Sequence, residues 1–106
     1  MSYKVAGIDV HKKVVMVVVA EAGQEVGLLE RKRFSTMSGD LQRLAAWLRE
    51  LGVEKAVMES TAQYWKPVWY ELEPHLRLQL AQAYSNRAPR GREILEIVQE
   101  MSPSAA

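Results

Sequence analysis

The first third of the chain consists of short apolar runs separated by polar turns. Residues 4–10 and 14–20 are mostly apolar and are separated by only three polar residues, 11–13, which predicts a β-hairpin. After the next turn, residues 26–34 predict a third strand, whose second half, residues 30–33, is densely charged. Such charges are typical of a strand at the edge of a sheet, where they discourage pairing with another chain. The pattern therefore predicts three consecutive antiparallel strands.

The spacing of the apolar residues then becomes helical. Ser38 is the predicted N-cap, and Asp40 adds a negative charge to the first turn, where the helix dipole favours it. The apolar residues that follow at helical spacing are Leu41, Leu44, Ala45, Leu48 and Leu51. Gly52 ends the pattern, as glycine often does just after a helix.

A short apolar strand, residues 56–58, comes next. Ser60 and Gln63 match a capping box, which predicts a second helix with Pro67 near its first turn and an end at about Glu73.

Leucines alternate with polar residues over 76–80, which predicts a one-sided strand, and the apolar spacing over 94–101 predicts a last amphipathic helix. The predicted order is β-β-β-α-β-α-β-α in a single α/β domain, residues 1–101, with a disordered tail at 102–106. Three antiparallel strands followed by two strands with helical connections imply a mixed five-stranded sheet with helices on its faces. This is the topology of the ribonuclease H-like (RuvC-like) fold.

Composition narrows the class of protein. The 106 residues include no cysteine, which excludes a disulfide scaffold, a thiolate zinc site and a cysteine nucleophile. The formal net charge of +1 removes the simple argument for nucleic-acid binding by a strongly basic domain. The longest apolar run, residues 14–20, is far shorter than a membrane-spanning helix. We therefore expect a cytoplasmic protein.

Two acidic residues, Asp9 and Glu59, lie at the ends of strands that are otherwise apolar. If the first and fourth strands are adjacent and parallel, both carboxylates lie at the carboxyl edge of the sheet, where ligands of open α/β sheets bind. Two converging carboxylates repel each other unless a cation neutralises them, and oxygen ligands suit Mg²⁺ or Mn²⁺. Such a site can position a phosphodiester and activate water. The alternative is structural: Asp9 accepts hydrogen bonds from the turn at 11–13, and Glu59 caps the helix after it.

The chain resembles the N-terminal RuvC-like domain of the DEDD-type insertion-sequence transposases, which are relatives of the Piv-type invertases. The segments that carry the resemblance are Gly7-Ile8-Asp9-Val10-His11-Lys12, Met58-Glu59-Ser60-Thr61 and Tyr64-Trp65-Lys66-Pro67-Val68-Trp69. The resemblance covers about residues 4–92. It implies Mg²⁺-dependent (or Mn²⁺-dependent) cleavage and joining of DNA strands, with Asp9 and Glu59 as catalytic metal ligands. It also implies DNA as a partner, together with a structured non-coding RNA.

Members of that family use four acids, and this chain matches only the first two. The second pair is expected shortly after residues 89–92, where Leu95 and Val98 stand in place of aspartates. Glu93 and Glu96 are close by, but a helix turns ~100° per residue, so a shift of one position does not restore the same face. Whether either substitutes is left open by the sequence. Family members are also much longer. We therefore interpret the chain as a truncated catalytic fragment that is inactive alone and binds Mg²⁺ weakly.

Three further features have two interpretations each. Arg87, Arg90 and Arg92 form a basic loop that either contacts phosphates or is simply solvated. His11 is close enough to Asp9 to orient water, but we interpret it as a histidine of a surface turn. The aromatic residues that either stack on bases or belong to the core are Tyr64, Trp65, Trp69 and Tyr70.

The competing hypothesis is a non-enzymatic remnant that binds nucleic acid or associates with itself. We expect a homodimer, formed through the apolar last helix and the tryptophan-rich segment. An actin-like or sugar-kinase fragment would share only Gly7-Ile8-Asp9, and the glycine-rich phosphate loops of those proteins are absent from the sequence. We set that possibility aside.

Overall fold

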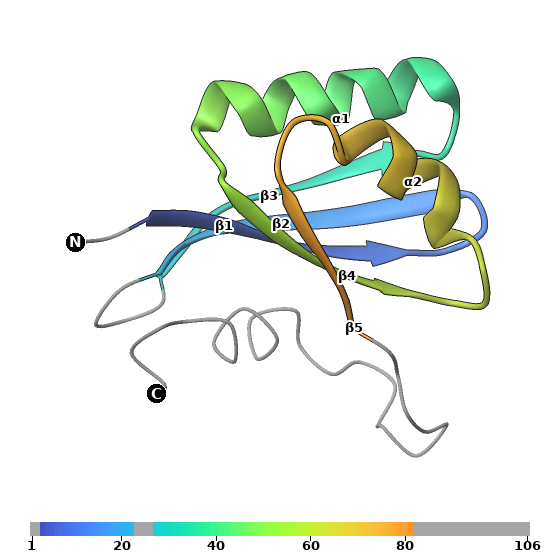
Figure 1. Ribbon diagram of the computed structural model, residues 1–106, viewed down its shortest axis with the longest axis horizontal. Coiled ribbons are helices and arrows are strands. Elements are labelled where there is room, and N and C mark those ends of the chain that lie inside the picture. The colour runs from blue at the N-terminus through green and yellow to red at the C-terminus, as the bar shows by residue number, and fades with distance from the viewer. Residues whose placement is uncertain (1–2, 23–26, 82–106) are drawn as a thin grey trace.

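The computed structural model describes residues 3–22 and 27–81 (Figure 1). Its elements are β1 (Tyr3–Val10), β2 (Val14–Ala22), β3 (Gly27–Ser35), α1 (Ser38–Leu51), β4 (Lys55–Ser60), α2 (Trp65–Leu72) and β5 (Arg77–Ala81). The strands form one mixed sheet in the order β3-β2-β1-β4-β5. β2 is antiparallel to both β1 and β3, whereas β4 is parallel to both β1 and β5. The predicted mixed five-stranded sheet is confirmed, and the predicted last helix and tail lie outside the described residues.

The predicted hairpin and edge strand are also confirmed. β1 and β2 are joined by the turn at residues 11–13, which is closed by a hydrogen bond of 2.8 Å from the backbone N–H of His11 to the carbonyl of Val14. β3 is the outermost strand on its side of the sheet, and its charged residues 30–33 are exposed.

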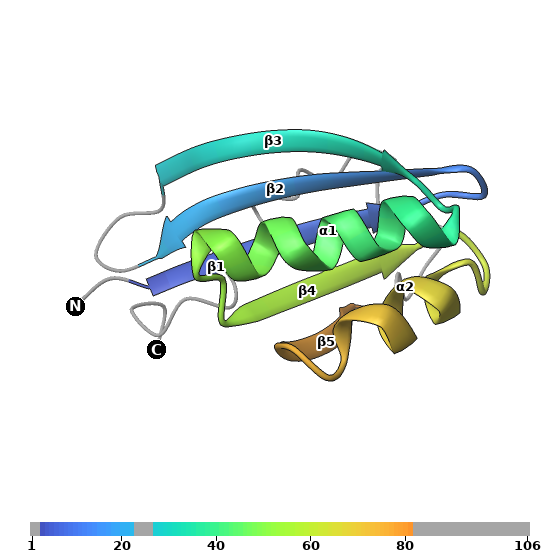
Figure 2. The same ribbon diagram turned by 90° about the horizontal axis from the view of Figure 1, so that it is seen from above.

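Both described helices cover the same face of the sheet (Figure 1). Seen from above, α1 lies over the central strands and runs roughly along them (Figure 2). Because side chains alternate along a strand, every second residue points into this layer. The buried residues of the layer include Ala6, Ile8, Val10, Val17, Leu44, Leu48, Met58, Val68 and Leu72. Neither described helix is long and apolar enough to cross a membrane.

The opposite face of the sheet is apolar at its centre. Val5, Val18, Ala20 and Val57 are buried, yet they do not belong to the core under the helices. These strands are therefore apolar on both faces, which explains why the valine run at 14–20 does not alternate with polar residues.

The end of α1 is as predicted, but its beginning is not. Gly52 adopts a left-handed conformation (φ 78°) and its N–H bonds the carbonyls of Arg49 and Leu48, which is a role that glycine fills without strain. The N-cap is Met37 and not Ser38, because the carbonyl of Met37 accepts the first helical hydrogen bond, 3.0 Å from the N–H of Leu41. Ser38 is thus the first helical residue.

The predicted capping box of the second helix is wrong. β4 continues through Ser60, so this residue belongs to the strand, and its hydroxyl donates to the carbonyl of Thr61 (3.1 Å). The helix begins later, at Trp65, and has no side-chain cap. Pro67 lies in its first turn as predicted, and the helix ends at Leu72, one residue before the predicted Glu73.

Candidate active site

The two acids singled out from the sequence lie side by side. β1 and β4 are adjacent and parallel, and their register pairs Asp9 with Glu59. Paired residues of neighbouring strands point to the same face, from backbones ~4.8 Å apart. Ile8 and Val10 point into the core under the helices, so Asp9 and Glu59 project from the opposite face. Both side chains are partly exposed, near the carboxyl ends of the two central strands.

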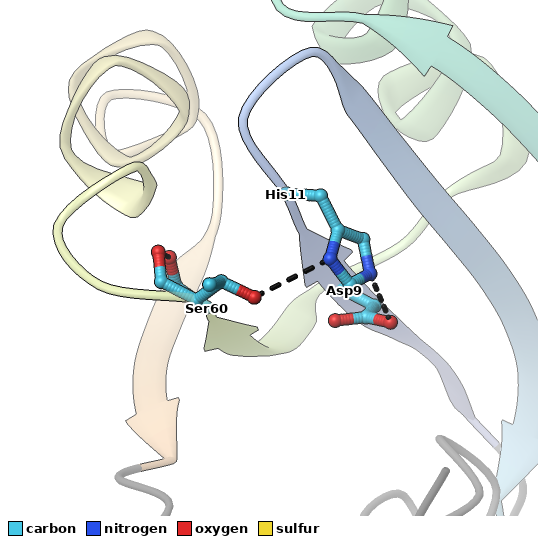
Figure 3. A network of polar contacts seen from close by, with 4 residues as sticks. Asp9, His11 and Ser60 are labelled. Atoms are coloured by element: carbon cyan, nitrogen blue, oxygen red, sulfur yellow. Dashed lines mark hydrogen bonds and ion pairs between the residues drawn. The ribbon is translucent and has the colours of Figure 1, made fainter. Parts of the chain in front are cut away.

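His11 links this acidic pair to the turn after β4. Figure 3 shows its ring between the Asp9 carboxylate and the chain that follows Ser60. The ring Nε2 lies 2.9 Å from Oδ2 of Asp9, and Nδ1 lies 3.3 Å from the hydroxyl oxygen of Thr61. The turn is also tied to β1 by a backbone hydrogen bond of 3.0 Å from Thr61 N–H to the carbonyl of Val10. His11 is half exposed, as a turn histidine should be, but it is also part of the site.

The two contacts select one tautomer of the neutral ring. A carboxylate only accepts hydrogen bonds, so Nε2 carries the proton and donates it to Asp9. Nδ1 is then an acceptor, and the Thr61 hydroxyl donates to it. The Asp9 carboxylate is thereby held through Oδ2, which leaves Oδ1 for a ligand. Asp9 thus accepts a hydrogen bond from the turn, as the structural alternative predicted. This bond occupies only one of its two carboxylate oxygens.

The turn that carries Thr61 also has an unusual backbone conformation. Ala62, directly after Thr61, has φ 50°, in the left-handed region that non-glycine residues adopt at a cost of ~1–2 kcal/mol. Thr61 thus enters a turn whose backbone is strained next to the candidate site.

The donor atoms fit a weakly held Mg²⁺ or Mn²⁺. Asp9 and Glu59 offer carboxylate oxygens, and Mg²⁺ is commonly bound by one or two carboxylates while it keeps several waters. Within residues 3–22 and 27–81, no three His, Cys, Asp or Glu side chains come together as a metal site. The described site is therefore a pair of acids and not a complete cage.

The other candidates separate into three groups. Trp65 and Trp69 pack against the core, with ring centroids 5.7 Å apart in an edge-to-face contact, so they belong to the core and not to a base-stacking surface. Tyr64 and Tyr70 are exposed, 37% and 66%. The predicted basic loop with Arg87, Arg90 and Arg92, and the acids Glu93 and Glu96, lie outside the described residues.

No protein-family model and no curated protein matches the sequence. Solved structures do match the fold. The fowlpox virus resolvase in complex with Holliday junction DNA superposes with a TM-score of 0.63 at 9% identity, over 90% of this chain and 71% of the resolvase chain. Thermus thermophilus RuvC in complex with a Holliday junction substrate gives 0.56 at 16% identity, over 74% and 65% of the two chains. An Aquifex aeolicus member of the Ppx/GppA family gives 0.54 at 13% identity, over 78% and 36%.

These identities are low, so the likeness concerns the fold. The chain spans about a third of the length of the Ppx/GppA proteins that it matches (36%). The strand order, with a parallel β1–β4 pair at its centre, agrees with the matches to the resolvases. The chain therefore has the ribonuclease H-like fold that RuvC-like resolvases and Ppx/GppA proteins share.

Proposed function

We propose that this chain is the N-terminal catalytic fragment of a DNA transposase of the DEDD type. In this proposal Asp9 and Glu59 bind a divalent cation that supports the cleavage and joining of DNA phosphodiesters. The observation that carries the proposal is the register that pairs Asp9 with Glu59 at the carboxyl ends of the central parallel strands. Adjacent carboxylates whose oxygens face the same side of a sheet are a donor set that suits a divalent cation.

Each residue of the site has a defined part in this proposal. Asp9 offers Oδ1 to the cation while Oδ2 accepts from His11, and Glu59 offers the neighbouring carboxylate. Thr61 holds the His11 ring through Nδ1, with Nε2 directed at Asp9. A bound Mg²⁺ or Mn²⁺ would neutralise the two acids and act as a Lewis acid toward a phosphodiester and water.

DNA is the proposed substrate for two reasons. The motifs around Asp9 and Glu59 resemble those of DNA transposases, and the two resolvases of the same fold are in complex with Holliday junctions. The transposase resemblance adds a structured non-coding RNA as a further partner. The cytoplasm is the proposed place of action, because the sequence has no apolar run long enough to span a membrane and no cysteine. Because Leu95 and Val98 replace the second acidic pair of that family, we expect the isolated chain not to cleave DNA.

Manganese binding tests the metal site directly. We expect Asp9→Asn and Glu59→Gln each to weaken Mn²⁺ binding by about tenfold or more, measured by electron paramagnetic resonance, because the site has few ligands to share the loss. Glu50→Gln is the matched control, since it removes an exposed acid from α1, on the other face of the sheet. Unchanged Mn²⁺ affinity in Asp9→Asn, with the thermal unfolding midpoint preserved, would remove the metal site from the proposal.

A second function is favoured by the Ppx/GppA matches, which include a phosphatase and an exopolyphosphatase-like protein. Hydrolysis of polyphosphate, lost in Asp9→Asn, would point to that chemistry in place of DNA transposition. The chain could instead bind DNA without Mn²⁺, with the same affinity in Asp9→Asn. That result would favour the non-enzymatic remnant.

A further inference from the structure

The acidic pair belongs to a row of residues that crosses the whole sheet. The register pairs Arg33 of β3 with Met16 of β2, Met16 with Asp9 of β1, and Asp9 with Glu59 of β4. Paired residues project to the same side of a sheet. Arg33 therefore stands on the face that carries the two acids, opposite the helices. Arg31, two residues earlier on β3, points to the same side.

On β1, β2 and β4 this row is accessible, whereas the next row of the same face is buried. Val18 and Val57, two residues away along β2 and β4 on the same face, are buried. Asp9, Met16 and Glu59 are partly exposed, and Arg33 is exposed. A large ligand that reaches the acidic pair from this face thus lies along the row that leads to Arg33.

Two lysines extend the positive charge toward the acids. Lys12 and Lys13 occupy the exposed β1–β2 turn, two residues after Val10 at the end of β1. The turn is held against the end of β3, because the hydroxyl of Thr36 donates to the carbonyl of Lys12 (3.2 Å). We call the four residues Lys12, Lys13, Arg31 and Arg33 the basic edge.

The charges of the basic edge are not used within the described structure. The ion pairs found there are His11–Asp9 and Arg43–Asp40, and neither involves a residue of the basic edge. Lys32, in contrast, points to the helix side, where its ammonium lies 5.4 Å from the ring centroids of both Phe34 and Trp47. Protection of an edge strand explains why charges occur on β3. It does not explain why both unpaired arginines share the face of the acidic pair.

We infer that the basic edge binds the phosphate backbone of a DNA strand whose reacting phosphate lies at Asp9 and Glu59; the position of that phosphate rests on the proposed function. Arg33 is two strand spacings from Asp9, or ~10 Å along the row. That distance corresponds to a few nucleotides of one strand, so Arg33 contacts a phosphate close to the reacting one. The basic edge thus aligns the strand across the sheet, and its contacts carry no base specificity.

Salt-dependent DNA binding by the full chain tests this inference. The probe is a fluorescently labelled duplex, measured by anisotropy in EDTA over a range of salt concentrations. The variant Arg31→Gln/Arg33→Gln removes two positive charges from the basic edge. The control Arg49→Gln/Lys66→Gln removes two exposed charges from α1 and α2, on the other side of the sheet.

We expect the basic-edge variant to lose affinity by about tenfold near 0.1 M salt, and the slope of log K against log salt to fall by about two. The control should keep both the affinity and the slope of the unmodified chain. Equal losses in the two variants would mean that net charge alone governs binding, and no loss in either would mean that DNA binds elsewhere; both results overturn the inference. Competition with polyglutamate is a further test. If polyglutamate displaces the duplex at equal charge concentration, the surface fits an acidic polypeptide, and the inference is overturned.

Asp9→Asn separates this inference from the proposed function. In EDTA this variant should bind the duplex at least as tightly as the unmodified chain, since it removes a negative charge from the path of the strand. If Asp9→Asn leaves Mn²⁺ affinity unchanged while the basic-edge variant loses DNA binding, the metal site fails and the basic edge stands. If Asp9→Asn loses Mn²⁺ affinity while the basic-edge variant keeps its DNA binding, the metal site is supported and the basic edge is not.

Discussion

At the scale of single residues, the candidate site depends on a contact that no sequence pattern shows. The motif Gly7-Ile8-Asp9 and the position of Glu59 after a short strand were sufficient to predict both acids. His11 and Thr61 are 50 residues apart, and they meet only because β1 and β4 pair in parallel and bring their ends together. The pairing of the two acids could therefore be predicted from the sequence, whereas the hydrogen bonds that orient Asp9 could not.

Thr61→Val tests whether this contact orients Asp9. The variant removes the donor to Nδ1 of His11 and with it a contact that holds the ring, so Nε2 should donate to Asp9 a smaller part of the time, although Asp9 still favours the proton on Nε2. Loss of such an outer hydrogen bond weakens metal sites by about 10–100-fold. We expect ¹⁵N chemical shifts of the His11 ring at pH 8 to report the change, with weaker Mn²⁺ binding beside it.

The chain offers two controls for this measurement. Thr61→Ser keeps a hydroxyl at the same place and should preserve both the orientation of the His11 ring and the affinity. His75, the other histidine, is exposed in the turn between α2 and β5 and should keep its ring shifts in every variant. If the His11 shifts are the same in Thr61→Val and in the unmodified chain, Thr61 does not orient the ring.

At the scale of elements, interiors were predicted well and beginnings were not. The helix over 41–51 and the strand over 76–80 follow apolar periodicities that reflect burial, and the structure has both. The N-caps depend on backbone angles at one residue, and serines at suitable positions are not sufficient evidence for them. At the start of α1 the polar role falls instead to Asp40, which accepts a hydrogen bond of 2.9 Å from the backbone N–H of Ser35.

Asp40 should make the stability of the fold depend on pH in the acid range. Hydrogen bonds from the side chain and backbone of Ser35, with Arg43 close by, lower the pKa of Asp40 from 3.8 to about 2. A carboxyl whose pKa is lower in the folded state stabilises that state above its unfolded pKa, and the contribution is lost as pH falls through the folded pKa. The stabilisation by Asp40 is thus complete above about pH 4 and disappears between about pH 4 and 2.

Asp40→Asn measures that contribution. Its thermal unfolding midpoint should be lower than that of the unmodified chain at pH 5, and the difference should shrink steadily as the pH is lowered toward 2. Glu50→Gln, an exposed acid of the same helix, serves as the control, and its difference should stay nearly constant. A gap between Asp40→Asn and the unmodified chain that is as wide at pH 2 as at pH 5 would show that Asp40 acts through packing and not through its charge.

At the scale of the whole molecule, strand order was predictable because the connections are short and follow general rules. Three antiparallel strands and two helical crossovers permit few sheets, and the observed order β3-β2-β1-β4-β5 is one of them. Whether the molecule has a working active site is a different matter. It depends on residues after 81, and there the sequence departs from the family that it resembles. The homodimer also stays a prediction; Trp65 and Trp69 pack against the core of the same chain, so its remaining support is the apolar pattern of the sequence over 94–101.

Restoring the missing acids tests whether the resemblance extends to that segment. In the family, aspartates stand where this chain has Leu95 and Val98. If these positions approach Asp9 and Glu59 as the resemblance implies, Leu95→Asp/Val98→Asp should raise Mn²⁺ affinity by about tenfold or more, since affinity for hard cations rises with the number of carboxylate ligands. The gain must vanish when Asp9→Asn is combined with the two changes, because acids that share one cation are coupled. A gain that survives Asp9→Asn would mean that the new acids bind Mn²⁺ by themselves, away from the sheet. An unchanged affinity would mean that residues 94–101 do not occupy the family position, and the transposase resemblance would then end with the described fold.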